Sequence, residues 1–467
     1  MPAQESLDTR FALLGKSAHP VILSRRRAAL PYRRTNERSW ICSNIRRKIA
    51  RLWLEMTNYQ VVSPGGAKRE GVTRGPLVLP VWTHETYREI VRAISSRRIV
   101  NGDALHKLQV VISERLGVRS VLLCGSGRLA LELALRACGV QPGDEIVVPT
   151  FCCSAIVPPI LSMGATPVLA DIGNELNVTA ETVAAVLTRK TRAVIVPHLF
   201  GNPADIQAIS TLVQSRNFHV IDDAAQALGA TIGDESVGSF GNFGILSFGN
   251  EKLCPSIGGG ALVSRGNETF DLKSAMPLTS APYVETLRRC LSTLIWNRWR
   301  DWLAPVAKLR GSRYDPTAMP LPYGREAMAN VYAAAAVTLV KRLSEQIAAR
   351  RERVRAYQEL LGQKASLELI PHRVGSACLT QVVRVLPRKR SRDMATDVVN
   401  AVAAEGFEVH GSYVPLHLIP GLGACVWDRL PYADRIWFDM IELPCAPSVS
   451  FDDLARIATI VAAVANA

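Results

Sequence analysis

The sequence predicts an α/β protein in which a large domain with a mostly parallel sheet is followed by a smaller α+β domain. Seven short runs in the middle of the chain are almost continuously apolar, as expected of strands buried on both faces of a parallel sheet. Segments with helical spacing lie between the runs, and this alternation is typical of α/β folds. The predicted strands cover residues 118–123, 145–148, 167–170, 193–196, 219–221, 244–248 and 261–264.

The predicted helices follow from apolar residues that recur every three or four positions. Helices over residues 128–138, 180–188 and 205–216 separate the strands, and one long helix is expected over residues 328–361. The end of the chain mixes both patterns, which indicates the smaller α+β domain. Its strands are expected at 380–386 and 407–413, and its helices at 393–405 and 451–464.

We expect three parts along the chain. Residues 1–75 form a basic extension that does not read as part of a packed core, and residues 76–325 form the large domain, with a helical insertion near 270–320. Residues 326–467 form the small C-terminal domain. The extension holds 15 Lys and Arg against 5 Asp and Glu and so carries most of the net charge of +14. It is explained by a start codon chosen too far upstream, by a basic tail that touches acidic surfaces, or by a cleaved targeting segment.

Composition excludes several classes of protein. Because the chain beyond the extension is only mildly basic, its charge does not predict nucleic-acid binding. Ten cysteines without a C-x-x-C pair predict a reducing, cytoplasmic location and no metal site. The most apolar region, roughly 145–170, is interrupted by prolines and is too short to span a membrane. The segment 284–310 has Leu and Trp at helical spacing among arginines, so it packs on protein or makes a peripheral contact with the inner face of a membrane.

Two segments place candidate functional groups at the ends of predicted strands. Gly125-Ser126-Gly127-Arg128 follows a strand and opens a helix, so its backbone N–H groups can cradle a phosphate, although any tight turn may use glycines. Asp223 follows the strand at 219–221, where functional groups gather in an open α/β sheet. A carboxylate there needs a cation or donors, and a protonated pyridine nitrogen would be a suitable partner. A helix-capping or supporting role for Asp223 stays open.

The third segment places a lysine just beyond a buried strand. Lys252 follows the strand at 244–248 and is flanked by Gly249 and by three glycines at 258–260. Desolvation at such a position lowers the pKa of an amine and makes it a usable nucleophile and base. Most lysines are solvated surface groups, so the order of phosphate turn, acid and lysine in one sheet is what favours a functional role.

These segments resemble the DegT/DnrJ/StrS family of sugar aminotransferases, over roughly residues 77–467. The matching motifs are DAAQALGA at 223–230, GSFG at 238–241, SFGNEK at 247–252, PGDE at 142–145, GATP at 164–167 and HLFG at 198–201. The resemblance implies a pyridoxal 5'-phosphate enzyme of fold type I, usually a homodimer. It also implies an amino donor, glutamate, and a keto-sugar acceptor on a nucleotide.

The resemblance assigns roles to single residues. It implies that Lys252 is the Schiff-base lysine and the catalytic base, that Asp223 binds the pyridine nitrogen, and that Gln226 lies near the ring hydroxyl. Gly127 and Ser247 fall where the phosphate is held. The stretch from Tyr413 to His417 also matches, and we expect these two residues to contact the substrate.

Three positions depart from the family pattern. Cys153 stands where an aromatic residue stacks on the cofactor ring, and Arg128 stands where a small hydroxyl residue follows the phosphate-loop glycine. Arg128 could pair with the phosphate or obstruct it. The Asn-Tyr-Arg motif that leads into the long helix is not evident near residues 325–330. These departures keep open the alternative of a catalytically impaired or regulatory member that binds the cofactor without transamination.

Overall fold

The computed structural model describes most of the chain from Trp82 onward. The described residues are 82–214, 216, 218–266, 277–310, 322–386 and 394–466, with only the backbone for 298–310. The expected extension at 1–75 lies outside them, as does part of the expected insertion at 270–320. The expected boundary between residues 325 and 326 stays a prediction.

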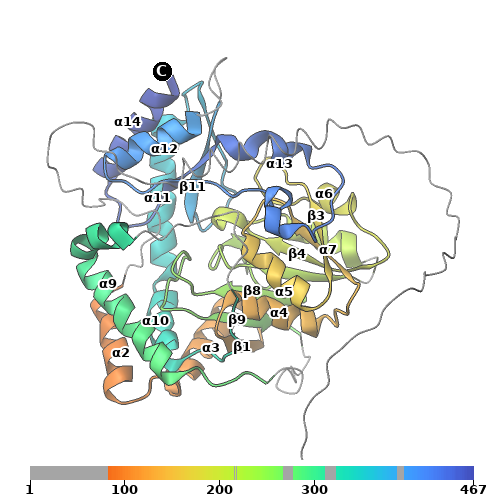
Figure 1. Ribbon diagram of the computed structural model, residues 1–467, viewed down its shortest axis with the longest axis vertical. Coiled ribbons are helices and arrows are strands. Elements are labelled where there is room, and N and C mark those ends of the chain that lie inside the picture. The colour runs from red at the N-terminus through yellow and green to blue at the C-terminus, as the bar shows by residue number, and fades with distance from the viewer. Residues whose placement is uncertain are drawn as a thin grey trace, which may run out of the picture. The chain divides into compact units, whose positions relative to one another are not determined.

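The seven predicted strands form one sheet, in the order β1-β9-β8-β5-β4-β2-β3 (Figure 1). Five neighbouring strands, from β8 to β3, run parallel, and β9 is antiparallel to both of its neighbours. The prediction of a mostly parallel sheet is therefore confirmed. The strands are β1 Ser120–Cys124, β2 Glu145–Pro149, β3 Thr166–Ala170, β4 Thr191–Pro197, β5 His219–Asp223, β8 Phe243–Ser247 and β9 Gly260–Ser264.

Helices such as α3, α4, α5 and α7 pack on this sheet through apolar side chains, and α2 and α10 pack on other helices. The helix α4 is buried along almost its whole length, and its leucines join the core formed with β2 and β3. A second core lies under α3 and α10. The helices of this part are α2 His84–Ser95, α3 Asp103–Leu116, α4 Gly127–Ala137, α5 Val157–Ser162, α6 Ala180–Ala184, α7 Ile206–Gln214, α9 Tyr283–Arg310 and α10 Asn330–Lys341.

A smaller antiparallel sheet follows, in the order β10-β11-β13-β12. Helices pack on it around a core of valines and leucines, so the expectation of an α+β end to the chain is confirmed (Figure 1). The elements are β10 Leu367–Leu369, β11 Thr380–Val385, β12 His410–Gly411, β13 Met440–Pro444, α11 Leu343–Leu361, α12 Met394–Ala404 and α14 Phe451–Asn466.

The single long helix expected over residues 328–361 is wrong. The chain forms α10 and α11, and Arg342 between them leaves helical geometry at φ −93° and ψ 5°. Its N–H bonds the carbonyl of Leu339, three residues back, which tightens the last turn of α10 and ends it. No proline or glycine marks the break, so the apolar spacing alone continues through it.

Two other predicted elements are shorter than expected. The helix α6 ends at Ala184 rather than 188, and the strand expected at 407–413 is reduced to His410–Gly411. In the second case Tyr413 lies outside the sheet, and its hydroxyl accepts a hydrogen bond from Gln226, in the turn after β5, at 2.7 Å. Tertiary contacts of this kind compete with a local strand pattern.

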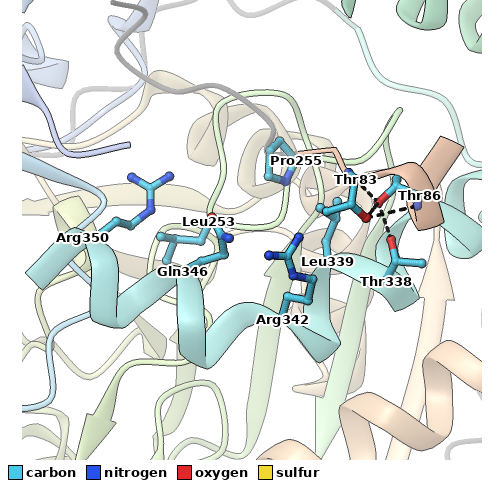
Figure 2. A pocket seen from close by; sticks show the side chains of 9 residues that line it. All are labelled: Thr83, Thr86, Leu253, Pro255, Thr338, Leu339, Arg342, Gln346 and Arg350. Atoms are coloured by element: carbon cyan, nitrogen blue, oxygen red, sulfur yellow. Dashed lines mark hydrogen bonds between the residues drawn. The ribbon is translucent and has the colours of Figure 1, made fainter. Parts of the chain in front are cut away.

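A pocket lies at the junction of α10 and α11, next to the segment that follows Lys252. Figure 2 shows Arg342 of this junction on the same side as Leu253 and Pro255 of that segment. Thr86 of α2 and Thr338 of α10 close one end, with 2.8 Å between their hydroxyl oxygens. Among the described helices, none combines the length and the apolar character needed to cross a bilayer.

Candidate active site

The acid and the lysine singled out in the sequence lie at the same edge of the large sheet. Asp223 is the last residue of β5, and Lys252 follows the end of β8, the neighbouring parallel strand. Burial raises the pKa of Asp223, and the positive charge of Lys252 partly opposes this shift. The two side chains therefore act on each other electrostatically, although they lie far apart along the chain.

The Asp223 carboxyl group has room for a cationic partner. One of its oxygens accepts a hydrogen bond from the Ala225 N–H at 3.0 Å. Within the described part of the chain, no Lys, Arg or His nitrogen forms an ion pair with it. A partly buried acid without a direct counter-charge fits a protonated ring nitrogen, which would bring a donor and a positive charge together.

The glycine turn lies against the end of β8. Ser126 caps α4 by accepting a hydrogen bond from the Leu129 N–H at 3.2 Å. Gly127 opens the helix, and a Cβ atom added there would lie 3.0 Å from the Cβ atom of Ser247. The first N–H groups of a helix have no partners within it, and the helix dipole favours an anion beside them. The two residues expected to hold a phosphate are thus neighbours in space.

Residues 81–462 match the DegT/DnrJ/EryC1/StrS aminotransferase family. The chain belongs to this family. It is 27% identical over 365 residues to a GDP-perosamine synthase of Caulobacter vibrioides, covering 76% of this chain and 88% of the relative. It is 28% identical over 389 residues to the spore coat polysaccharide biosynthesis protein SpsC of Bacillus subtilis, covering 81% and 94%.

The fold is shared with a solved aminotransferase of Streptoalloteichus hindustanus, with a TM-score of 0.65 and 24% identity over 83% of this chain and 98% of that one. Together these similarities identify a pyridoxal-phosphate-dependent aminotransferase, whose relatives transfer amino groups to sugars and related compounds. The Asp223 carboxyl group and the turn at Gly127 fit that cofactor, since one lacks a cation and the other is suited to an anion.

The family resemblance placed Gln226 near the ring hydroxyl, and the structure gives it two hydrogen-bonding partners. Its side-chain N–H donates to the Tyr413 hydroxyl at 2.7 Å, and its carbonyl oxygen accepts from the Phe200 N–H at 2.9 Å. Burial raises the pKa of Tyr413 far above its usual range, so the hydroxyl stays protonated. Gln226 and Tyr413 thus connect the large sheet to the segment that follows β12.

Aromatic residues that the sequence analysis did not single out surround Tyr413. The ring of Phe151 lies edge-on at 5.9 Å, and that of Phe200 lies at 5.8 Å, tilted by 32°. Phe200 adopts a left-handed backbone conformation with φ 58°, which is unusual for a bulky residue and is often found at functional sites. The motif at 198–201 pointed to this place, but a positive φ cannot be read from a phenylalanine.

Cys153 lies at the same site, after the end of β2, and is partly exposed. Its thiol is close enough to add to the pKa shift of Tyr413, for which burial is the main cause. A thiol offers less surface than the aromatic ring expected at this position of the family. Whether it contacts the cofactor ring stays a prediction.

Arg128 has a contact that neither sequence-based alternative included. Its guanidinium lies over the ring of Tyr323, 5.3 Å from the centroid. One turn further along α4, the buried Glu132 accepts hydrogen bonds from the Tyr323 hydroxyl at 2.9 Å and from Arg325 at 2.8 Å. Arg128 therefore helps to hold the segment before α10 against the helix that begins at the phosphate turn. Its predicted contact with the phosphate stays a prediction.

His417 connects two segments through both of its ring nitrogens. Nδ1 is 2.7 Å from the Thr150 hydroxyl, and Nε2 is 2.7 Å from a carboxylate oxygen of Asp434. Its side chain is only 6% exposed. These bonds hold the segment after Tyr413 to the end of β2, and the expected substrate contact of His417 stays a prediction.

A carboxyl group of the small sheet, missed by the sequence analysis, also faces this region. Burial is the main cause that raises the pKa of Glu442 to about 7, and the negative charge of Glu251 adds to the shift. Glu251 precedes Lys252, and Ser412, which precedes Tyr413, lies 3.5 Å from Glu442. Glu442 sits in the middle of β13 in an ordinary strand pattern, so no sequence signal marked it.

Proposed function

We propose that this enzyme moves an amino group from an amino acid, with glutamate as the donor, to a keto sugar carried on a nucleotide. The product would enter a surface polysaccharide or an amino-sugar secondary metabolite. The names of the relatives support this acceptor class, because one is a GDP-perosamine synthase and another serves a spore coat polysaccharide.

The proposal assigns one task to each residue of the site. Bound pyridoxal phosphate supplies an electron sink that stabilises negative charge at the donor Cα atom. The Lys252 amine would hold the cofactor covalently and then carry the proton at that Cα. The Asp223 carboxylate would keep the ring nitrogen protonated, and Gly127 and Ser247 would hold the phosphate.

One observation carries the proposal: Asp223 ends β5 and Lys252 follows the neighbouring parallel strand β8, and Ser247 at the end of β8 lies against the turn at Gly127. This arrangement supports the proposal, because a cofactor bound through a ring nitrogen, a covalent lysine and a phosphate would need an acid, an amine and an anion-binding turn at one edge of the sheet.

The first experiment is spectroscopic. Purified protein incubated with pyridoxal phosphate should show a visible absorption band of the bound cofactor, and Lys252→Ala should lose the band. Lys364→Ala, which changes an exposed lysine after α11, should keep it. Equal spectra of the wild type and Lys252→Ala would show that Lys252 is not the covalent lysine.

The second experiment tests transamination itself. Glutamate added to the loaded enzyme should abolish the visible band, and a suitable nucleotide-linked keto sugar should restore it. Cys153 favours one other function, a member that binds the cofactor without turnover, because a thiol gives the ring little support. That function predicts a band that no amino acid changes, so a response to glutamate excludes it.

Assembly and location are part of the proposal. We infer a cytoplasmic homodimer, and light scattering in solution should give twice the mass of the chain. A peripheral membrane contact is supported by the apolar side chains of Val284, Leu291 and Ile295, which α9 exposes. Flotation with anionic vesicles should then weaken in Leu291→Ser and in a variant that lacks residues 1–75. Salt-insensitive, equal behaviour of all three proteins would exclude the contact.

A further inference from the structure

A second acid lies next to Asp223 and has its own buried partner. The Nε2 atom of His198 is 2.7 Å from a carboxylate oxygen of Asp222, and both side chains are fully buried. The other carboxylate oxygen accepts hydrogen bonds from the Gly238 and Phe240 N–H groups, at 2.8 and 2.9 Å. Three donors thus converge on the Asp222 carboxylate.

The hydrogen bonds fix the protonation of His198. Its Nδ1 atom accepts a hydrogen bond from the Ala204 N–H at 2.8 Å, and a backbone N–H can only donate. Nδ1 therefore carries no proton, so the proton is on Nε2 and the ring is neutral. All three donors to Asp222 are neutral groups, and the carboxylate keeps its negative charge.

The turn at 238–240, which supplies two of these donors, packs closely against the strand β8. Gly238 has φ +96°, a conformation that favours glycine. A Cβ atom added at Gly244 of β8 would lie 1.8 Å from the Gly238 carbonyl oxygen, so no larger residue fits there. The GSFG and strand glycines of the sequence are thus explained by the bonds that they allow to Asp222.

This pair acts directly on Asp223. The two acids are consecutive in β5, so their side chains point to opposite faces of the sheet. The backbone N–H of His198 also donates a hydrogen bond to the backbone carbonyl oxygen of Asp223, at 3.2 Å, which holds the end of β5 in place. Burial is the main cause that raises the pKa of Asp223, and the negative charge of Asp222 makes a small contribution in the same direction. A cationic His198 would oppose this shift, but the Ala204 N–H excludes that form.

We propose that His198 and Asp222 are positioning residues for the cofactor. His198 holds Asp222 without neutralising it, and Asp222 fixes the place and strengthens the charge with which Asp223 binds the ring nitrogen. This inference rests on the role of Asp223 in the proposed function. The inference explains why a buried carboxylate, that of Asp222, directly precedes Asp223 in β5, because Asp223 needs to keep its proton affinity to bind the ring nitrogen.

The test compares two ligands of the cofactor-free protein: pyridoxal phosphate and an analogue in which a C–H group replaces the ring nitrogen. Both can link to a lysine and both carry the phosphate, so the ratio of their affinities reports the ring nitrogen alone. Asp222→Asn and His198→Leu should lower this ratio about tenfold, the value for one pKa unit, with little change for the analogue. His198→Gln, which keeps a donor towards Asp222, should restore most of the ratio.

Asp171→Asn is the matched control. Asp171 also follows a parallel strand of the sheet and accepts hydrogen bonds from the N–H groups of Tyr432 and Ala433, at 2.8 and 3.0 Å. Its loss should lower the midpoint of thermal unfolding but leave the ratio unchanged. If Asp222→Asn weakens both ligands equally, the pair is merely structural and the inference is overturned. If the wild type does not distinguish the ligands, the role of Asp223 itself fails.

A measurement on the wild type decides the case even if a variant does not fold. In cofactor-free protein labelled with ¹⁵N-histidine, the His198 ring should carry a single proton, on Nε2, because Nδ1 accepts the hydrogen bond of the Ala204 N–H. A His198 ring with protons on both nitrogens would cancel the charge of Asp222 and would overturn the inference.

Discussion

Replacement of Glu442 by glutamine should change how the stability of the protein depends on pH. The carboxyl group is partly buried in the small sheet, and Thr380 donates a hydrogen bond to it at 3.2 Å. Burial is the main cause that raises its pKa to about 7 in the folded protein. In the unfolded chain the group should titrate near its ordinary value of about 4.3. Glutamine keeps the shape and an acceptor for Thr380 but cannot ionise.

The sign follows from proton binding. Between the two pKa values the folded state holds a proton that the unfolded state has lost, so the wild type loses stability as the pH rises through this range. A difference of two to three pKa units corresponds to about 4 kcal/mol at most. Glu442→Gln should therefore be close to the wild type near pH 4 and more stable by up to about 4 kcal/mol near pH 8.

Urea unfolding of the cofactor-free protein, followed by circular dichroism over this pH range, measures the difference. Glu359→Gln, at an exposed position of α11, is the control, and its free energy of unfolding should depend on pH in the same way as that of the wild type. A Glu442→Gln protein that also runs parallel to the wild type would refute the reasoning. It would mean that water reaches the carboxyl group freely.

Two further substitutions test the packing of the site and of the helix junction. Gly127→Ala should weaken pyridoxal phosphate binding about tenfold, because the added Cβ atom lies 3.0 Å from Ser247 and displaces the side chain that faces the phosphate turn. Thr338→Val should lower the free energy of unfolding by about 1 kcal/mol, because it removes the buried 2.8 Å hydrogen bond between the Thr86 and Thr338 hydroxyl groups.

Each substitution has its own comparison. Gly423→Ala adds a methyl group where no atom lies within 4 Å, so it should leave cofactor affinity unchanged. Unaltered affinity of Gly127→Ala would remove this turn from the cofactor site. Thr459→Val affects an exposed hydroxyl that bonds only its own helix, so a loss of stability as large as that of Thr338→Val would show that burial is not the cause.

The sheet could be predicted from the sequence because its strands carry their signal locally. Runs such as 193–196 are apolar at every position, as expected of strands that are covered on both faces of a parallel sheet. The C-terminal ends of the parallel strands then had to meet at one edge, so Asp223 and Lys252 lie at the same edge of the sheet. The helix break at Arg342 could not be predicted in this way, because it depends on a backbone hydrogen bond rather than on a residue type.

The parts of the site that escaped prediction depend on contacts between distant segments. Tyr413 was singled out, but its bond to Gln226 depends on how the small sheet meets the large one. The sequence suggested only a phosphate contact for Arg128. Its contact with the ring of Tyr323 could not be predicted, because Tyr323 is remote in sequence. The charge of Asp222 depends on the tautomer of His198, and this is set by a backbone N–H that no side-chain pattern reveals.

The hydrogen bond between Gln226 and Tyr413 has a practical consequence for dissecting the enzyme. A fragment that stops before α10 would retain Asp223 and Lys252 but would lack the phenol that Gln226 binds. In such a fragment the Gln226 side chain would lose its hydrogen bond to the C-terminal part of the chain. In a chimeric enzyme, the C-terminal part that contains Tyr413 should therefore come from the same parent as Gln226.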